Sequence, residues 1–449
     1  MFYSEIVAHF IADLKMEQIP ASVKQRAKEL MLDTLGTALA AHKEQSVQNA
    51  LNAFECLDKQ NEKFHKFKLW GQDKSLNAEF AAMFNGISAH ALDFDDTHTE
   101  AILHASAILA PLCLSWGFSV CDDGEKVLKA FILGWEVGAR IGVASKGSFH
   151  KRGFHTTAIC GTFASAVAAG VLLDLNEEEF INALGLAGSF ASGVNEFLSN
   201  GSNSKLLHIA NAIKNGILAA NFAKNKLTGP KSIFEGRDNV FHTFGIEELC
   251  DKNELNKDLD ELWQVLQVSI KPYPCCHFAH GLIECALALR NDGLKAGQIE
   301  QIQCFVDEVP ISFICDPINA KYTPQSAYEA KFSMPFLMAT AFTDGALNLH
   351  SYENLKRGEV LEFARKITYE KRQNKGFPKY FPGHIKARLA NGDEIQKDIF
   401  INKGNPDNPL SLDELKHKFF DNAKMCCDEK VAQIYFEKIM NLEKQRAFE

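Results

Sequence analysis

The chain has 449 residues, of which 46% are hydrophobic and 23% charged, and its formal net charge is −9. This composition is ordinary for a well-packed globular protein, and at about 150 residues per domain the length predicts more than one domain. The acidic balance and the lack of a basic stripe argue against a nucleic-acid partner. Any site for an anionic substrate must therefore be built locally, against the overall charge.

The cysteine pattern points to a reducing environment. The chain has 12 cysteines, but no two have the CxxC spacing typical of structural zinc sites or iron–sulfur ligands. No run of about 18 apolar residues predicts a membrane span. The first residues lack the basic start and long apolar core of a signal peptide. We therefore expect a cytoplasmic protein with no membrane partner and no metal. The sequence has no GxGxxG after a predicted strand and no Walker loop, so we also expect no cofactor.

From residue 3 to about 265 the signals are helical. Apolar residues recur there at spacings of three and four, and several segments are rich in Ala and Gly, which lets helices approach closely. The segments predicted to be helical are 4–15, 21–42, 77–92, 105–120, 125–145 and 157–174. We expect them to form an all-helical body.

Near residue 266 the sequence pattern changes to short runs in which apolar and polar residues alternate, as is typical of strands. The segments 265–270 and 299–309 read as strands, and 384–401 reads as a hairpin around Asn391-Gly392. Helical segments at 277–290 and 325–342 lie between them.

After residue 408 the signal returns to helix, and Ser411 with Glu414 has the spacing of a capping box. We therefore predict a mainly α fold. It would have a large all-helical domain formed by both chain ends, 1–265 and 409–449, and a smaller α+β domain over 266–408.

The first candidate motif, HALDFDDTH with a downstream histidine, spans residues 90–104. It contains Asp93, Asp95, Asp96, His90, His98 and His104. One interpretation is that Asp95, Asp96 or Thr97 caps the next helix. Another is an acid–base site in which a carboxylate fixes a histidine tautomer. A third is magnesium binding, which usually needs a second Asp-rich helix that this sequence lacks.

Two further motifs open predicted helices. Arg152 and His155 precede the helix at 157, where free amide groups and the helix dipole favour a carboxylate, although Gly153 and Thr156 equally suit a turn and cap. Lys205 opens another helix, in a position that the helix dipole disfavours. Such a conflict is typical of a functional residue, but a solvated surface lysine remains an alternative.

The fourth motif, KPYPCCHFAH, begins at Lys271 near the expected domain boundary, where pockets often form. Two prolines hold it extended before a helix. Its Cys276 is either a proton donor or a plain core thiol.

Taken together and in order, these segments resemble the MmgE/PrpD family. The resemblance extends over nearly the whole chain and also includes GFHTTAICGTFASA, SKLLHIANAIKNG, LTGPKSIFEG and AYEAKFSMPF. It implies a large helical domain with a smaller α+β lid domain, and a homodimer. Known activities in the family are 2-methylcitrate dehydratase, cis-aconitate decarboxylase and iminodisuccinate epimerase, which act on small polycarboxylates without a cofactor or metal.

The resemblance also implies roles for matched residues. His104 would be the general base or acid, oriented by Asp93, and His155 the second proton-transfer group. Lys205 and Lys271 would bind substrate carboxylates.

Three more residues complete the expected site. Thr97 would position the substrate, Arg152 would help bind it, and Cys276 would lie beside it. Decarboxylase-like members have histidine at the position of Cys276 and tyrosine at that of Phe336, and both changes argue against cis-aconitate decarboxylation. We therefore expect a 2-methylcitrate dehydratase-like hydro-lyase. The first alternative is an epimerase of an imino- or amino-dicarboxylate, and a cis-aconitate decarboxylase is the less favoured one.

Overall fold

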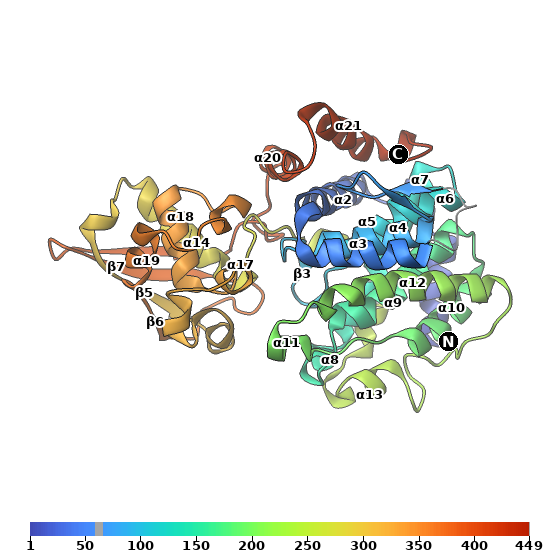
Figure 1. The fold of residues 1–449 in the computed structure, drawn as a ribbon. Helices are drawn as coiled ribbons and strands as arrows, with labels where there is room; N and C mark the ends of the chain where they lie inside the picture. Colours follow the sequence, from blue (N-terminus) through green and yellow to red (C-terminus); the bar gives the residue numbers. More distant parts are fainter. Residues whose placement is uncertain (59–65, 449) are drawn as a thin grey trace. The chain divides into compact units, whose positions relative to one another are not determined.

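The computed structural model describes residues 1–58 and 66–448, which divide into two compact units. The first unit combines Met1–Ile270 with Ser411–Glu449, and the second is Lys271–Leu410 (Figure 1). Most of the described residues are helical, so the predicted mainly α character is confirmed.

The helices of the first unit follow the predicted segments closely. They are α1 (Tyr3–Asp13), α2 (Ala21–Ala40), α3 (Gln45–Asp58), α4 (Ala78–His90), α5 (Ser106–Pro111), α6 (Phe118–Val120), α7 (Gly124–Ala144), α8 (Ser148–Lys151), α9 (Thr156–Leu172), α10 (Glu177–Phe190), α11 (Phe197–Asn200), α12 (Ser204–Lys224), α13 (Val240–Phe244), α20 (Leu412–Ala423) and α21 (Glu429–Met440).

The centre of this unit is α9, which packs against α7 and α12, and every residue of α9 is buried. Its high content of Ala, Gly and Ser lets the neighbouring backbones approach closely. A Cβ on Gly216 of α12 would lie only 2.1 Å from the Cβ of Ser165. Because α4 and α12 also pack together, the ends of α4, α9 and α12 are held in a fixed arrangement.

The C-terminal helices α20 and α21 pack on α2, from the other end of the chain (Figure 1). The Oγ of Ser411 accepts from the amide of Glu414 at 3.2 Å, and the Glu414 carboxylate accepts from the amide of Ser411 at 2.7 Å. The predicted capping box is therefore confirmed.

Some predicted elements differ in detail. The helix expected over 105–120 is interrupted by a π-helical stretch, Leu112–Gly117, that follows Pro111. Two short strand pairs also occur in the helical unit: β1 (Phe67–Lys68) with β2 (Ser75–Leu76), and β3 (Thr97–His98) with β4 (Val268–Ser269).

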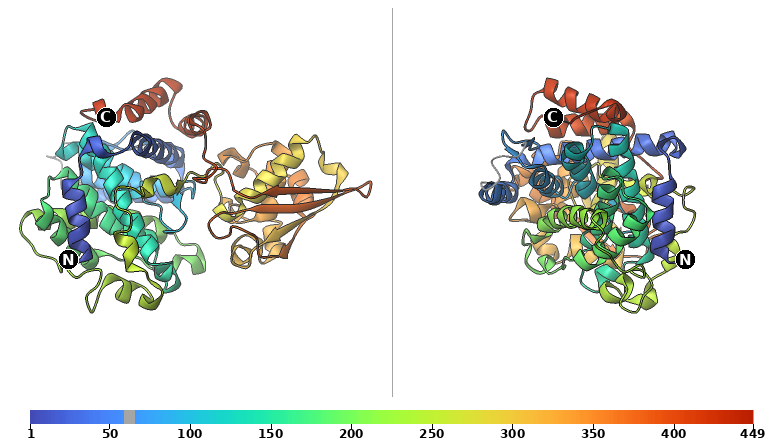
Figure 2. Two further views of the ribbon diagram at one scale, coloured as in Figure 1. Left: turned by 180° about the vertical axis from the view of Figure 1, so that it is seen from behind. Right: turned by 90° about the vertical axis from the view of Figure 1, so that its right-hand side faces the viewer.

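The second unit contains a four-stranded sheet in the order β6-β5-β7-β8. Its strands are β5 (Ile299–Val306), β6 (Ile367–Lys371), β7 (Gly383–Leu389) and β8 (Glu394–Ile399). Only β5 and β6 are parallel. The β7–β8 hairpin confirms the turn predicted at Asn391-Gly392, and Gly392 has a φ of +90° (Figure 2).

Helices α14 (His280–Asn291) and α18 (Met334–Asp344) pack together in this unit, and α19 (Gly358–Ala364) packs on α18. The shorter helices are α15 (Glu308–Pro310), α16 (Ile318–Lys321) and α17 (Ala327–Ala330). The helix expected over 325–342 is split between α17 and α18, because Ser333 caps α18 by accepting from the amide of Phe336.

We predict that Gly216→Ala destabilises the first unit. The new Cβ would lie 2.1 Å from the Cβ of Ser165 and 2.6 Å from the amide nitrogen of Ala166. Overpacking of about 1–3 kcal/mol outweighs the gain in helix propensity of about 1 kcal/mol. Calorimetry should show a lower melting temperature. The control is Gly358→Ala, whose Cβ meets no atom within 4 Å and should not lower it; equal melting temperatures would contradict the prediction.

Candidate functional site

The loop between α4 and α5, residues 91–105, carries the first sequence motif. Asp95 and Asp96 are fully buried there, and Asp93 has a φ of +55°, a left-handed conformation that aspartate tolerates better than most residues. The interpretation in which Asp95, Asp96 or Thr97 caps the next helix stays a prediction. The N-cap residue of α5 is Ala105, and it forms no side-chain cap.

His104 is held in one tautomer by the loop itself. Its Nδ1 lies 2.6 Å from the backbone oxygen of Asp96 and 3.3 Å from Oγ1 of Thr97. A carbonyl oxygen only accepts, so Nδ1 carries the hydrogen and Nε2 is the basic nitrogen of the neutral ring. The side chain is 15% exposed, so it lies within reach of a small molecule.

A second histidine of the motif forms a buried dyad. Nδ1 of His90 lies 2.6 Å from Oδ2 of Asp95, and both side chains are 0% exposed. Burial lowers the pKa of His90, and the charge of Asp95 opposes that shift. The same carboxylate oxygen is 3.8 Å from Nδ1 of His104. Asp95 therefore supports both imidazoles.

The third imidazole of the motif, His98, is a core residue. Its Nδ1 accepts from the amide of Ala101 at 3.1 Å, and its Nε2 lies 3.0 Å from the side-chain oxygen of Gln264. Burial lowers its pKa to about 4, so the ring stays neutral. Both ring nitrogens are used in holding β3 in place.

His155 and His208 face each other from the first turns of α9 and α12. Their Nδ1 atoms are 3.1 Å apart and their ring centres 5.2 Å apart, so one ring donates and the other accepts. Burial, with the nearby charge of Lys205, lowers the pKa of His155 well below its usual value. Burial lowers the pKa of His208 to about 4. Both rings are therefore neutral near pH 7.

Lys205 connects α12 to the loop. Its Nζ lies 3.3 Å from Oδ1 of Asp93, and the two side chains are 22% and 18% exposed. The alternative of a solvated surface lysine is therefore wrong. This partly exposed ammonium group, beside neutral imidazoles, can attract a carboxylate.

Below the loop lies a buried ion pair. Nζ of Lys418, on α20, is 2.6 Å from Asp33 of α2, and it donates to the backbone oxygen of Phe94 at 3.2 Å. It also lies 3.8 Å from the centre of the Phe94 ring. Burial raises the pKa of Asp33, and Lys418 opposes that shift. The C-terminal helix thus holds the motif loop from beneath.

The structure brings together five of the predicted residues, which are Asp93, Thr97, His104, His155 and Lys205. It places Arg152 on the surface, where its Nη1 lies 3.4 Å from the backbone oxygen of Gly245. Lys271 and Cys276 belong to the second unit, so their roles stay predictions.

The orientation of His104 also differs from the expectation. The backbone oxygen of Asp96 fixes its Nδ1, while the Asp93 carboxylate pairs with Lys205. The expected orienting role of Asp93 stays a prediction.

Sequence reasoning did not select His90 or His208. His208 lies three residues after Lys205 in one helix, a spacing that puts both side chains on one face, so this signal was available. His90 was part of the first motif, but the motif gave it no separate role. Its ring centre approaches those of His104 (5.3 Å) and His155 (6.1 Å) through tertiary packing, which the motif does not reveal.

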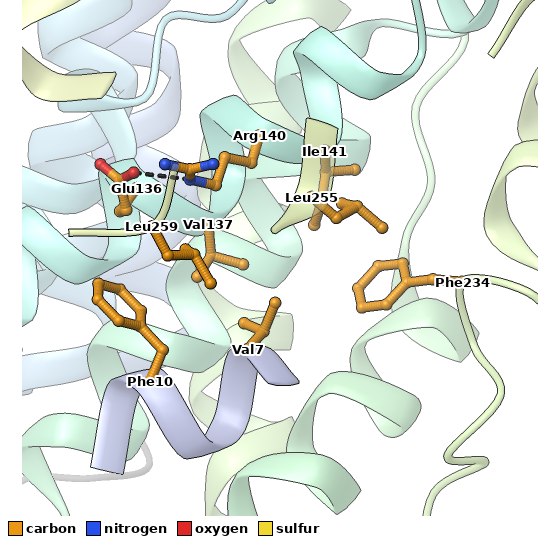
Figure 3. Close-up of a pocket in the computed structure, with 9 residues that line it drawn as sticks. All are labelled: Val7, Phe10, Glu136, Val137, Arg140, Ile141, Phe234, Leu255 and Leu259. Carbon is orange, nitrogen blue, oxygen red and sulfur yellow. Dashed lines mark hydrogen bonds and ion pairs between the residues drawn. The ribbon is translucent and has the colours of Figure 1, made fainter. Parts of the chain in front are cut away.

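A separate small pocket lies beside α1 and α7 (Figure 3). Apolar side chains such as Val7, Phe10 and Leu255 line it, and the ion pair of Glu136 and Arg140, 2.7 Å apart, lies at its edge. Because Arg140 also donates to the backbone oxygens of Lys257 and Leu262, its charge is engaged in holding that loop. This pocket does not suit a polycarboxylate.

Residues 1–58 and 66–448 contain neither a metal-ligand cluster nor a membrane-spanning helix. No group of three or more His, Cys, Asp or Glu side chains is arranged to hold a metal ion. None of the helices described there is both long and apolar enough to cross a membrane.

Comparison with known proteins places this geometry in context. Residues 5–249 match the MmgE/PrpD N-terminal domain, and residues 273–442 match the MmgE/PrpD C-terminal domain. Cis-aconitate decarboxylase of Aspergillus terreus is 25% identical over 94% of this chain and 89% of its own length. The proteins of the same name from Mus musculus and Homo sapiens are 27% and 26% identical over 98% of this chain and 91% and 92% of theirs.

We predict that Lys418→Met strongly destabilises the first unit. It leaves the carboxyl group of Asp33 buried without its cation, and breaking such a pair costs about 3–5 kcal/mol. Calorimetry should show a large fall in melting temperature. The double variant Asp33→Asn/Lys418→Met should recover much of it, because no buried charge is left over. A double variant no more stable than the single one would contradict this account.

Proposed function

The chain belongs to the MmgE/PrpD family, and from that premise we propose that it is a cofactor-independent lyase acting on a small di- or tricarboxylate. The proposed reaction is the removal of water from a β-hydroxy acid, as in 2-methylcitrate dehydratase. The observation that carries it is His104, whose Nδ1–H is fixed on the Asp96 carbonyl so that Nε2 is basic. This ring lies in a cluster of neutral imidazoles beside the ammonium group of Lys205.

In this proposal, Nε2 of His104 takes the proton from the carbon next to a substrate carboxylate. The C–H electron pair becomes the second bond of the alkene, and the C–O bond breaks as hydroxide leaves with a proton from His155. Lys205 binds the carboxylate whose negative charge grows in the transition state, with Lys271 binding a second one. Stabilising that charge in a partly buried site lowers the barrier.

The acid role of His155 depends on the substrate. In the free protein its pKa is well below the usual value, so the ring is neutral near pH 7. A bound polycarboxylate brings negative charge close to the ring, and an opposite charge within about 4–6 Å favours the protonated form. We therefore propose that substrate binding charges His155 and so prepares the acid.

Two other reactions could use the same residues. An epimerase would need the same two proton-transfer groups on opposite faces of one carbon. Decarboxylation is suggested by the names of relatives at about 25% identity. Against it stand Cys276 and Phe336, which replace the histidine and tyrosine of decarboxylase-like members.

We further propose that the protein is a cytoplasmic homodimer. None of the 12 cysteines forms a disulfide in the described structure, which suits a reducing compartment. Exposed apolar side chains at Val194, Leu198 and Leu207 on the first unit could be covered by a second copy.

We predict that His104→Gln lowers turnover at least about a hundredfold, because a general base typically contributes about 10²–10⁴ in rate. Proton NMR in D₂O, with methylcitrate or citrate as substrate, would follow the new alkene signal. Wild-type activity should not change on adding EDTA.

The same experiment separates the alternatives. Deuterium entering the α-position without an alkene would indicate an epimerase, and carbon dioxide release from cis-aconitate would indicate a decarboxylase. His242→Gln is a matched control, since this exposed histidine pairs with Glu247 at 3.1 Å, apart from the cluster. Wild-type turnover by His104→Gln would overturn the assignment.

We also predict that ligand binding takes up protons. At pH 6.5 the free site holds neutral His155, and a bound tricarboxylate should raise the pKa of that ring, so the complex binds more protons than the free protein. Titration calorimetry with tricarballylate, in buffers of different ionisation enthalpy, measures this uptake. His155→Gln should reduce it. Binding by the wild-type protein without proton uptake would contradict the acid role.

A further inference from the structure

His90 lies between the two histidines to which the proposed mechanism gives the proton transfers. Its ring centre is 5.3 Å from that of His104 and 6.1 Å from that of His155. The ring is fully buried at the end of α4, and the mechanism above gives it no role.

The two nitrogens of this ring have very different surroundings. Nδ1 is 2.6 Å from the carboxylate of Asp95, which only accepts, so Nδ1 carries a hydrogen. Nε2 is buried and has no hydrogen-bond partner within the part of the chain that the structure describes. A buried polar atom left unsatisfied costs about 1–3 kcal/mol, so its presence needs an explanation. Nε2 therefore offers a lone pair that no structural contact uses.

A dehydratase must also reset its proton-transfer groups. After one turnover the base His104 holds the proton taken from carbon, while the acid His155 has lost its own. The first substrate draws the proton of His155 from solution as it binds. In later turnovers, the proton held on His104 is the nearer source for His155. Both groups are largely buried, with His104 15% exposed and His155 8% exposed, so exchange with bulk water is restricted.

We propose that His90 is a proton relay that carries this proton from His104 to His155, with Asp95 as its positioning residue. The inference rests on the proposed function and adds a residue to it. The proton leaves Nε2 of His104 and binds Nε2 of His90, making a cation that the Asp95 carboxylate stabilises. It then leaves the same nitrogen for the ring of His155. Because Nε2 of His90 is in hydrogen-bond contact with neither ring, a water molecule bridges each gap. Each water gives up one proton as it takes another, so only N–H and O–H bonds form and break and no water is consumed.

The charge arrangement supports this assignment. A carboxylate on Nδ1 both fixes the tautomer of an imidazole and stabilises the imidazolium, as in Asp–His pairs of hydrolases. Here the same oxygen of Asp95 is 2.6 Å from His90 and 3.8 Å from His104, so it favours a shared proton on either ring.

The test is the shape of the progress curve for His90→Gln, followed by alkene absorbance after rapid mixing. Glutamine can still donate to Asp95 but cannot take up and release a proton. We expect the first turnover to stay within a few-fold of wild type, and later turnovers to slow at least tenfold, giving a burst of one alkene per site. Added imidazole buffer should restore the later turnovers.

Any other result for His90→Gln or for the wild-type protein overturns either the relay or the proposed function. Steady turnover at the wild-type rate, or slowing that already affects the first turnover, would overturn the relay alone. If the wild-type protein forms no alkene, the proposed function fails and the relay with it. His242→Gln should behave as wild type and serves as the matched control.

A second measurement needs no substrate. In protein with ¹⁵N-labelled histidine, the resonances of His90, identified by their loss in His90→Gln, should show a protonated Nδ1 and an unprotonated Nε2 at neutral pH. The opposite tautomer would overturn the relay whatever the activity.

Discussion

The buried ion pair between Lys418 and Asp33 joins the two ends of the chain beneath the candidate site. The lysine also donates to the backbone oxygen of Phe94, inside the loop that carries the aspartates and His104. An uncompensated buried charge is costly, so each partner requires the other. This explains physically why the helices after residue 410 pack into the first unit: α20 completes the support of the loop.

Above that support, electrostatics determine what the site can bind. Burial lowers the pKa values of His90, His155 and His208, so the rings are neutral, and the ammonium group of Lys205 is the exposed charge beside them. Lys205 is paired with Asp93, and the Asp95 carboxylate lies against His90, so the charges of the cluster are largely balanced within it. Under the proposed function, a substrate carboxylate would compete with Asp93 for the ammonium group of Lys205.

The sequence allowed prediction of features that depend on neighbouring residues. The hairpin at Asn391-Gly392 and the capping box at Ser411 follow from local turn and cap chemistry, and both are present. The sequence predicted one helix over 325–342, but the structure has two, α17 and α18. The division was missed because the single Ser333 cap interrupts an otherwise continuous apolar pattern.

The site was predictable only in part, for a related reason. Motif spacing identified the residues that now lie around His104, but the partner of its Nδ1 is a backbone oxygen, which leaves no trace in a sequence. Arg152 was expected at the site because it is close to His155 in sequence. In the structure Gly153, with a φ of +94°, turns the chain between them, and Arg152 lies on the surface.

The residues discussed for the proposed reaction are divided between the two units of the chain. The residues proposed to move protons, His104 and His155, belong to the first unit, and so does Lys205. The positions at which this chain departs from decarboxylase-like members, Cys276 and Phe336, both belong to the second. Under the proposed function, the first unit supplies proton transfer that dehydration, epimerisation and decarboxylation all need. The positions that argue against decarboxylation under that proposal therefore belong to a different unit from the proposed base, so a change at either of them leaves the hydrogen-bonded support of His104 unaltered.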